Sequence, residues 1–378
     1  MKISKLTIKN LFMTATLIFT VAACSNDEED NNEISSDDLK PTLQQYVSAV
    51  VVKTYNLLAN EALELSERCK TLQQQATQEN VQAAAQKWID ARKYWEESEA
   101  FLYGPATSYS IDPHIDSWPL DQNQLQQLLA NTVTMSQMSA DYAGKYLGYG
   151  LLGFHALEYV LFRNGQARNV NEIPALELVY AAAVAEDLAR QCVRLEAAWA
   201  GIANISNDKQ QILEDCELEP DINYGEVFVN AGKSGNTVFR TQKAAITQIL
   251  MGCSDIADEV ANTKITDPVA SGNVLDVESW YSWNSITDFA DNIRGIDYAY
   301  NGERVENANI LSVSSYLSKI NPSLDGKIRE AIKTAIREIE NMPAPFRDHL
   351  TEAETNAAKT ACQQLQELLD EAMDEINN

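Results

Sequence analysis

Apolar residues recur at helical spacing along most of this chain, as they do on the buried face of an α-helix. Runs in which β-branched residues alternate with polar ones, the pattern of half-buried strands, do not stand out. The helical period predicts helices over roughly 40–72, 80–103, 122–139, 142–163, 174–203, 238–262, 278–301, 322–342 and 351–376. The sequence therefore predicts an all-α protein.

Capping residues mark the start of several of these helices. Asn321 precedes Pro322, and proline suits the first position of a helix. Two further stretches match the capping-box pattern, in which a polar N-cap residue is followed three positions later by Glu or Gln: Asp121-Gln-Asn-Gln124 and Thr351-Glu-Ala-Glu354. We expect helices to begin at these points.

A segment rich in turn-forming residues interrupts the helical pattern between about 203 and 237. It contains Pro220 and several glycines, which punctuate regular structure. At 378 residues the chain is long enough for two domains. We expect two helical bundles, over 40–205 and 225–378.

The N-terminal end has the features of a leader. Three lysines precede a short apolar run from Leu11 to Ala23, which is typical of a signal peptide and too short for a stable membrane span. The small residues directly before Cys24 resemble the lipobox of bacterial lipoproteins, in which this cysteine is lipidated. We therefore predict a signal peptide over 1–23 and a mature protein that begins at Cys24.

The next stretch, residues 24–39, is polar and acidic with few large apolar side chains, which predicts a lipidated flexible tether. An acidic run behind the lipidated cysteine is also similar to the surface-export signal of some lipoproteins. The predicted location is the cell envelope, as an outer-membrane lipoprotein that faces either the periplasm or the outside.

Charge and cysteine content exclude several classes of function. The chain has 55 acidic against 29 basic residues, a net charge of −26, so it lacks the basic surface that nucleic acid requires. An acidic protein suits a cationic ligand or simply stays soluble. Five cysteines follow Cys24 and none forms a C-x-x-C pair, which argues against a zinc ribbon or a thioredoxin-like site.

One of the three histidines, His155, precedes Glu158 by three positions within an apolar helical run. Residues at this spacing share a helix face, so the imidazole and the carboxylate can point to one place. Such a pair can bind a metal ion. It can equally be a buried histidine with its own hydrogen-bond partner.

Two other predicted helices place polar groups among core residues. Over 80–103, Arg92 and Glu99 share a stripe with Trp88 and Trp95. A buried Arg or Glu is tolerated only when it is paired or binds something. On the predicted helix over 278–301, a second polar stripe comprises Glu278, Ser282, Ser285 and Asn292.

The ordered set of these motifs resembles the imelysin family of bacterial envelope lipoproteins. The matching residues are Gly153-x-His155-x-x-Glu158, Trp88…Arg92…Trp95…Glu99-Ala-Phe…Gly104-Pro105, Asp116-Ser-Trp118-Pro119 and Glu278-Ser279-Trp-Tyr-Ser282…Asp288-Phe. The resemblance covers about residues 40–375. It implies two related helical bundles that arose by duplication, with a site at their interface. It also implies membership of a nominal metallopeptidase family and a link to iron uptake.

Peptidase chemistry and metal capture make different demands on these residues. The common zinc peptidase motif H-E-x-x-H is absent, and the inverted motif H-x-x-E-H would need histidine where Tyr159 stands. Imidazole and carboxylate ligands suit iron or zinc. We therefore favour a non-catalytic protein that captures a divalent metal ion or a small metal-bearing ligand between its two halves, together with an outer-membrane uptake partner.

The hypothesis assigns His155, Glu158 and Glu99 as metal ligands, with Asp116 and Glu278 as further carboxylates that could complete the set. Arg92 would orient a carboxylate and Trp118 would wall the site against water. Polar contacts to a ligand are assigned to Arg92, Asp116, Trp118, Glu278, Ser279 and Ser282.

Two alternatives stay open. One is a zinc peptidase with an unusual ligand set that includes His114 or a distant carboxylate. The other is a glycan- or ligand-binding surface module in which Trp118, Trp280, Tyr281 and Trp283 stack on sugar rings, although such aromatics more often pack between helices.

Overall fold

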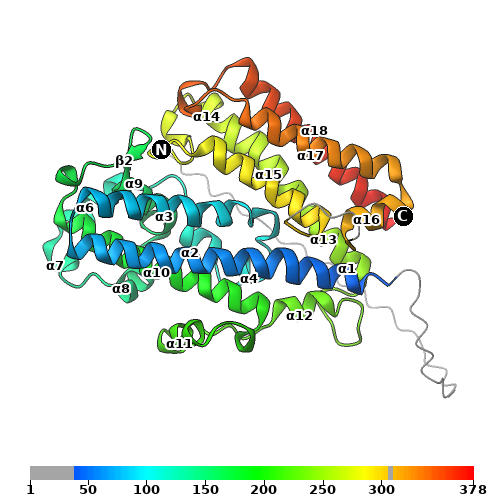
Figure 1. The fold of residues 1–378 in the computed structure, drawn as a ribbon, viewed down its shortest axis with the longest axis horizontal. Coiled ribbons are helices and arrows are strands. Elements are labelled where there is room, and N and C mark those ends of the chain that lie inside the picture. Colours follow the sequence, from blue (N-terminus) through cyan, green and yellow to red (C-terminus); the bar gives the residue numbers. More distant parts are fainter. Residues whose placement is uncertain (1–37, 305–309) are drawn as a thin grey trace, which may run out of the picture. The chain divides into compact units, whose positions relative to one another are not determined.

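The computed structural model describes residues 38–304 and 310–378, and residues Asp38–Asn378 form one compact unit (Figure 1). The predicted signal peptide, the lipidation site Cys24 and nearly all of the tether lie outside the described residues. None of the described helices is both long enough and apolar enough to cross a bilayer.

The first part of the unit is built around three long helices, α2, α3 and α10. Helix α2 packs against both of the others. Shorter helices surround them and carry several of the motif residues. The helices are α1 (Lys40–Gln45), the π-helix η1 (Tyr46–Val51), α2 (Val52–Gln74), α3 (Gln78–Glu96), η2 (Glu99–Phe101), α4 (Pro105–Ser108), α5 (Ile111–Ile115), α6 (Gln122–Ala130), α7 (Thr132–Met135), α8 (Ala140–Tyr146), η3 (Tyr149–Leu151), α9 (Gly153–Leu161), η4 (Val170–Glu172) and α10 (Ala175–Ala200).

The second part is built from α13, α15, α17 and α18, which pack side by side (Figure 1). Connecting it to the first part is a stretch with three short helices, η5 (Ile202–Asn204), α11 (Asn207–Asp215) and α12 (Tyr224–Val229). The remaining helices are α13 (Gln242–Glu259), the π-helix η6 (Val260–Ile265), α14 (Thr266–Ser271), η7 (Val274–Asp276), α15 (Ser285–Asn301), α16 (Val313–Ile320), α17 (Pro322–Glu340), η8 (Phe346–Asp348) and α18 (Ala353–Asn377).

A single antiparallel strand pair occurs in the described residues. Strands β1 (Phe162–Arg163) and β2 (Gln166–Ala167) pair with Phe162 opposite Ala167. The turn between them is Asn164-Gly165, and both residues have positive φ, as a two-residue hairpin requires. The backbone N–H of Gly165 donates to the carbonyl of Tyr281 at 3.0 Å, so this hairpin helps hold the loop before α15.

The prediction of an all-α fold is confirmed. Long helices with an uninterrupted apolar period were predicted best: the ranges 174–203, 322–342 and 351–376 correspond to α10, α17 and α18. The N-caps at Asp121 and Asn321 are also confirmed, because each side chain accepts a hydrogen bond from the backbone N–H three residues later. The capping box at Thr351 is wrong, because α18 begins with Glu352 as its N-cap and has no side-chain cap.

Four predicted helices were wrong in extent. The range 122–139 is divided at Asn131 into α6 and α7 and ends at Met135. The range 80–103 ends as an α-helix at Glu96, and Glu99 lies in the short turn η2. The range 142–163 is divided into α8, η3 and α9. The range 278–301 begins as α15 only at Ser285, because Ser279 and Trp283 have positive φ, a conformation that no α-helix contains. Glu278 and Ser282 therefore lie on a loop.

The core extends across both parts of the unit. Helix α3 lies against α15, and η2 lies against α13. At these contacts the backbones approach closely, since a Cβ on Gly252 of α13 would lie 2.2 Å from the carbonyl oxygen of Ala100, and one on Gly295 of α15 would lie 2.4 Å from that of Glu97. The division into bundles over 40–205 and 225–378, and their origin by duplication, stay predictions.

Candidate metal site

Gly153 opens helix α9 and brings two site residues together. Its φ is +74°, and a Cβ at this position would lie 1.9 Å from the carbonyl oxygen of Ile115. Only glycine tolerates both the dihedral and the approach. Because Ile115 is the last residue of α5, this contact places the next residue, Asp116, beside His155 on the first turn of α9.

The two tryptophans of the α3 stripe hold these segments in place. The indole N–H of Trp88 donates to the carbonyl of Phe154 at 2.8 Å, and that of Trp95 donates to Asp116 Oδ2 at 2.6 Å. Both indoles are fully buried. The apolar stripe on α3 therefore anchors both the α9 backbone and one oxygen of the Asp116 carboxylate.

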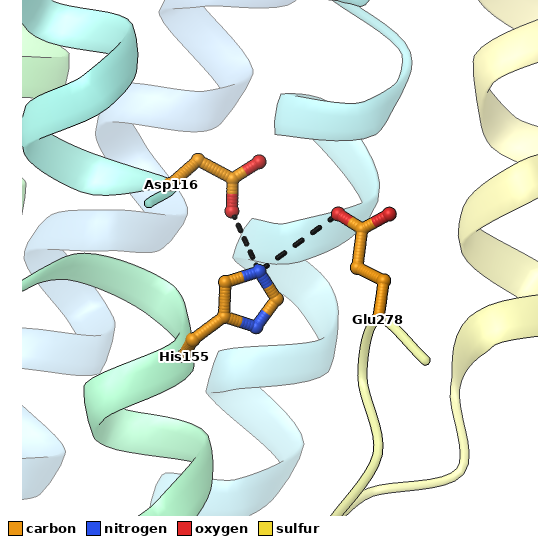
Figure 2. A group of neighbouring side chains, drawn as sticks. All are labelled: Asp116, His155 and Glu278. Carbon is orange, nitrogen blue, oxygen red and sulfur yellow. Dashed lines mark ion pairs between the residues drawn. The ribbon is translucent and has the colours of Figure 1, made fainter. Parts of the chain in front are cut away.

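His155 is fully buried, and its Nε2 atom faces two carboxylates (Figure 2). The distances from Nε2 are 3.2 Å to Asp116 Oδ1 and 3.8 Å to Glu278 Oε1. Neither approach has hydrogen-bond geometry, so Nε2 has no hydrogen-bond partner among the described residues. One atom each from Asp116, His155 and Glu278 forms a set in which all lie within 4.8 Å of one another.

The other ring nitrogen of His155 faces Glu158. Nδ1 lies 3.4 Å from Glu158 Oε2. The second oxygen of Glu158 accepts three hydrogen bonds from the loop before α15: from the backbone N–H of Tyr281 at 2.9 Å, and from the N–H and the hydroxyl of Ser282, each at 2.7 Å. Glu158 thus connects the imidazole to the segment that carries Glu278.

Arg92 lies at the centre of a buried group of acidic side chains. Its guanidinium contacts Glu96 and Asp116, lies 2.5 Å from Glu278 Oε1, and lies 3.8 Å from Asp288 through Nε. Both oxygens that face His155 Nε2 are therefore also contacted by Arg92. The role of Arg92 in orienting a carboxylate for a ligand stays a prediction.

Lys264, from the π-helix η6, is the second buried cation. Its Nζ lies 3.0 Å from Glu278 Oε2, 3.2 Å from Glu99 Oε1 and 3.6 Å from Glu96 Oε2. A second set of closely spaced carboxylates, Glu96, Glu99 and Asp116, occurs next to the first. The ammonium group of Lys264 lies against two of these three, and the set around His155 is the one of the two that includes a nitrogen donor.

The buried charged groups of the site shift one another's pKa values strongly. Burial alone would raise the pKa of Asp116 and of Glu278, but Arg92 with His155 holds the former below its usual value, and Lys264 with Arg92 does so for the latter. Burial would lower the pKa of His155, yet its contacts with Asp116 and Glu158 raise the pKa to about 9.

In three more acids of this network the pKa is raised instead of lowered. Burial raises the pKa of Glu96 to about 7, and it raises the pKa of Glu99 and of Asp288 well above their usual values. The network thus holds a proton on some carboxylates and leaves Asp116 and Glu278 ionised.

Trp118 packs against the site from the solvent side. Its ring centroid lies 4.5 Å from that of His155, with the planes inclined by 57°. Trp118 also lines a cavity of about 710 Å³ whose other walls include Asp116, Lys264 and Glu278. Trp118 thus covers one side of His155, and the cavity gives solvent access to the two carboxylates. Its role as a wall against water stays a prediction.

The structure does not bring all predicted ligands to one point. Glu158 lies on the Nδ1 side of His155, and Glu99 lies with Lys264. The hydroxyl of Ser279 donates to Asp288 and that of Ser282 to Glu158. His114, considered as a ligand for the peptidase alternative, lies elsewhere.

His114 pairs with Asp187 of α10, with Nε2 2.6 Å from Oδ2. The five cysteines in the described residues are all free.

Three residues of the network were absent from the predicted set of site residues: Glu96, Lys264 and Asp288, the last of which was noted only within a motif that resembles the family. Glu96 follows Arg92 by four positions, the spacing of an intrahelical ion pair, and could have been found from that signal. Lys264 is distant in sequence from every other member, and no local pattern marks it.

Comparisons with known proteins assign the chain to a family. The family model described as Imelysin matches residues 51–372. Iron-regulated protein A of Synechococcus elongatus is 29% identical over 309 residues, which make up 82% of this chain and 77% of that protein. A crystal structure of a protein named as an iron-regulated protein A precursor, from Parabacteroides distasonis, superposes with a TM-score of 0.78 at 28% identity and covers 92% of this chain and 97% of that one.

An imelysin-like protein from Psychrobacter arcticum, at 14% identity, covers 91% of this chain and 94% of its own with a TM-score of 0.60, which supports the fold alone. The family model extends over most of the chain. The protein therefore belongs to the imelysin family.

Proposed function

We propose that this protein captures a divalent metal ion, with iron as the physiological cargo, through His155, Asp116 and Glu278. The observation that carries the proposal is the Nε2 atom of His155, which is fully buried, lacks a hydrogen-bond partner among the described residues and faces two carboxylate oxygens. Its attraction to Asp116 at 3.2 Å lacks hydrogen-bond geometry, so its bonding capacity is not met by the protein. A metal ion would satisfy it.

The spacing of the three atoms fits a metal ion with little rearrangement. Ligand atoms about 2.1 Å from a common ion lie about 3.0–3.4 Å apart in octahedral or tetrahedral geometry. The two distances from Nε2 are 3.2 and 3.8 Å. A nitrogen with two carboxylate oxygens is a donor set that suits iron or zinc.

Charge favours the same proposal. Around Arg92 and Lys264 lie the carboxylates of Glu96, Glu99, Asp116, Glu278 and Asp288. Burial raises the pKa of Glu96, Glu99 and Asp288, whereas the neighbouring cations keep Asp116 and Glu278 ionised, so negative charge is concentrated where a dication would bind. Arg92 contacts the same oxygens as the ion would, and it has Glu96 and Asp288 as alternative partners.

Iron is favoured over zinc by the relatives, two of which are named iron-regulated protein A. The role that we infer is capture in the cell envelope by an outer-membrane lipoprotein, anchored through Cys24, that hands its metal to an uptake partner. Glu158 acts in this proposal through His155: its carboxylate accepts a hydrogen bond from Nδ1–H, so that the metal displaces the proton from Nε2 and binds the lone pair of that atom.

Metal analysis of residues 25–378, purified without an affinity tag and incubated with Fe²⁺, Zn²⁺ or buffer, tests the proposal. We expect close to one ion per chain in the wild type. The variants His155→Ala and Asp116→Asn should lose it, whereas His349→Ala, which removes a half-buried histidine paired only with Glu352 among the contacts seen, should retain it.

Absence of metal from the folded wild-type protein would refute the proposal. In that case the imidazole is a structural element of the core. Hydrolysis of unfolded protein that depends on His155 and on added metal would favour the peptidase alternative, and glycan binding that survives His155→Ala would favour the surface module.

A further inference from the structure

The cavity next to the metal site has acidic groups from its floor to its rim. Its lining includes five carboxylates: Asp116 and Glu278 at the buried end, and Glu259, Asp267 and Asp276 toward solvent. The three outer acids come from separate elements, the end of α13, helix α14 and η7. Sequence motifs drew attention to none of them.

We propose that Glu259, Asp267 and Asp276 form an acidic entrance that draws in hydrated metal cations and excludes anionic metal chelates. The inference rests on the proposed function, and it specifies the chemical form in which the metal arrives. The aquated dication is the ligand that these walls favour, because a negatively charged complex such as ferric citrate would meet like charge along the whole path.

The cationic groups near the cavity do not offset this charge. Lys264 is the one basic residue in the lining, and its ammonium group already lies within 4.0 Å of Glu96, Glu99, Glu259 and Glu278. Arg92 is fully buried behind Asp116 and Glu278. Neither presents a free charge with which an anionic chelate could pair.

The size of the cavity agrees with a hydrated ion. Six water molecules at about 30 Å³ each occupy roughly 180 Å³, and the cavity volume is about 710 Å³. An ion can therefore enter with its hydration shell and lose water at the buried end, where His155 and the two inner carboxylates replace it. Rejection of anionic chelates then depends on charge and not on size.

Clefts lined by one sign of charge accelerate the association of oppositely charged ligands by about 10- to 1,000-fold. The effect falls steeply as the salt concentration rises. The triple variant Glu259→Gln, Asp267→Asn, Asp276→Asn removes the entrance charge without altering the inner ligands. Its matched control is Glu214→Gln, Asp208→Asn, Asp215→Asn, which changes net charge equally on α11, far from α14 (Figure 1).

Association of Fe²⁺ under anaerobic conditions can be followed in a stopped-flow instrument by the quenching of tryptophan fluorescence. The ring of Trp118 packs on His155, so its emission reports on the site. We expect the triple variant to associate about tenfold more slowly than wild type at an ionic strength of about 0.01 M, and to differ less than about twofold at about 1 M, where the screening length is about 3 Å. The α11 control should match the wild type, and ferric citrate should bind at least about tenfold more weakly than Fe²⁺.

The results separate this inference from the proposed function. Equal rates for the triple variant and the α11 control, with metal binding that still needs His155, would overturn the acidic entrance and leave the metal site standing. Binding of intact ferric citrate as tightly as Fe²⁺ would overturn the exclusion of anionic chelates. Failure of the wild type to bind metal from any source would refute both.

Discussion

The contact between Glu158 and the loop before α15 allows a prediction that separates stability from metal binding. In Glu158→Ala, the backbone N–H groups of Tyr281 and Ser282 and the Ser282 hydroxyl lose their acceptor. The N–H of Tyr281 is buried, and leaving it unpaired costs about 1–3 kcal/mol. Ser282 is half-buried and can recover part of its loss from water, so it adds about 1 kcal/mol.

With the loss of packing around a fully buried side chain, the expected destabilisation is about 3–5 kcal/mol. The unfolding entropy of a unit of this size is roughly 0.7 kcal/mol per kelvin, so Tm should fall by about 4–7 °C. Differential scanning calorimetry of residues 25–378 measures this directly. The control Glu67→Ala, at an exposed residue of α2 that pairs with Lys70, should change Tm by less than about 1 °C.

The variant Glu158→Gln keeps an oxygen for the Tyr281 and Ser282 donors, so it should cost only about 1–2 kcal/mol. Its amide nitrogen would face His155 Nδ1, where Glu158 Oε2 lies at 3.4 Å. That arrangement places the imidazole proton on Nε2, where it blocks the metal. Metal affinity should therefore fall about 10- to 100-fold, although none of the proposed metal ligands is changed. A Tm loss below about 1 °C in Glu158→Ala, or unchanged metal affinity in Glu158→Gln, would refute this reasoning.

Three further predictions test the construction of the site. Gly153→Ala should destabilise the protein by more than about 2 kcal/mol, because a Cβ meets the Ile115 carbonyl at positive φ, whereas Gly148→Ala, which has no atom within 4 Å of its Cβ position, should change Tm little in calorimetry. In native residues 25–378, Cys216 should be the first thiol to react with a maleimide by mass spectrometry, because the other four are buried. The pKa of His155 is raised to about 9, so its contribution to stability is fully present below about pH 6.5 and is lost as pH rises through 9; His155→Gln should flatten this part of the Tm profile.

The fold could be predicted from the sequence where a long helix carries an uninterrupted apolar period along its whole length. α10, α17 and α18 are of this kind. The range 278–301 was harder, because the loop Glu278–Trp283 continues the helical spacing of polar and aromatic residues. Its conformation depends on distant partners: the Glu158 carboxylate accepts hydrogen bonds from Tyr281 and Ser282, and the N–H of Gly165 donates to the Tyr281 carbonyl.

The site was predictable as a set of residues but not as a geometry. The spacing of His155 and Glu158 shows that they share a face, and it does not show which ring nitrogen faces the carboxylate. In the structure Glu158 takes Nδ1, and two acids from other segments, Asp116 and Glu278, face Nε2. That choice depends on the packing of α5 against Gly153, a contact between chain segments that periodicity does not encode.

The buried charge network argues for function because it is a poor way to stabilise a fold. Replacing a buried ion pair by apolar residues of similar volume is often neutral or stabilising, and here the acids exceed the cations. The excess is tolerated because protons are retained: burial raises the pKa of Glu96 to about 7, and those of Glu99 and Asp288 are higher than usual. Asp116 and Glu278, which face His155, are the two whose pKa is instead lowered. The network therefore keeps negative charge where a cation would bind and neutralises it elsewhere.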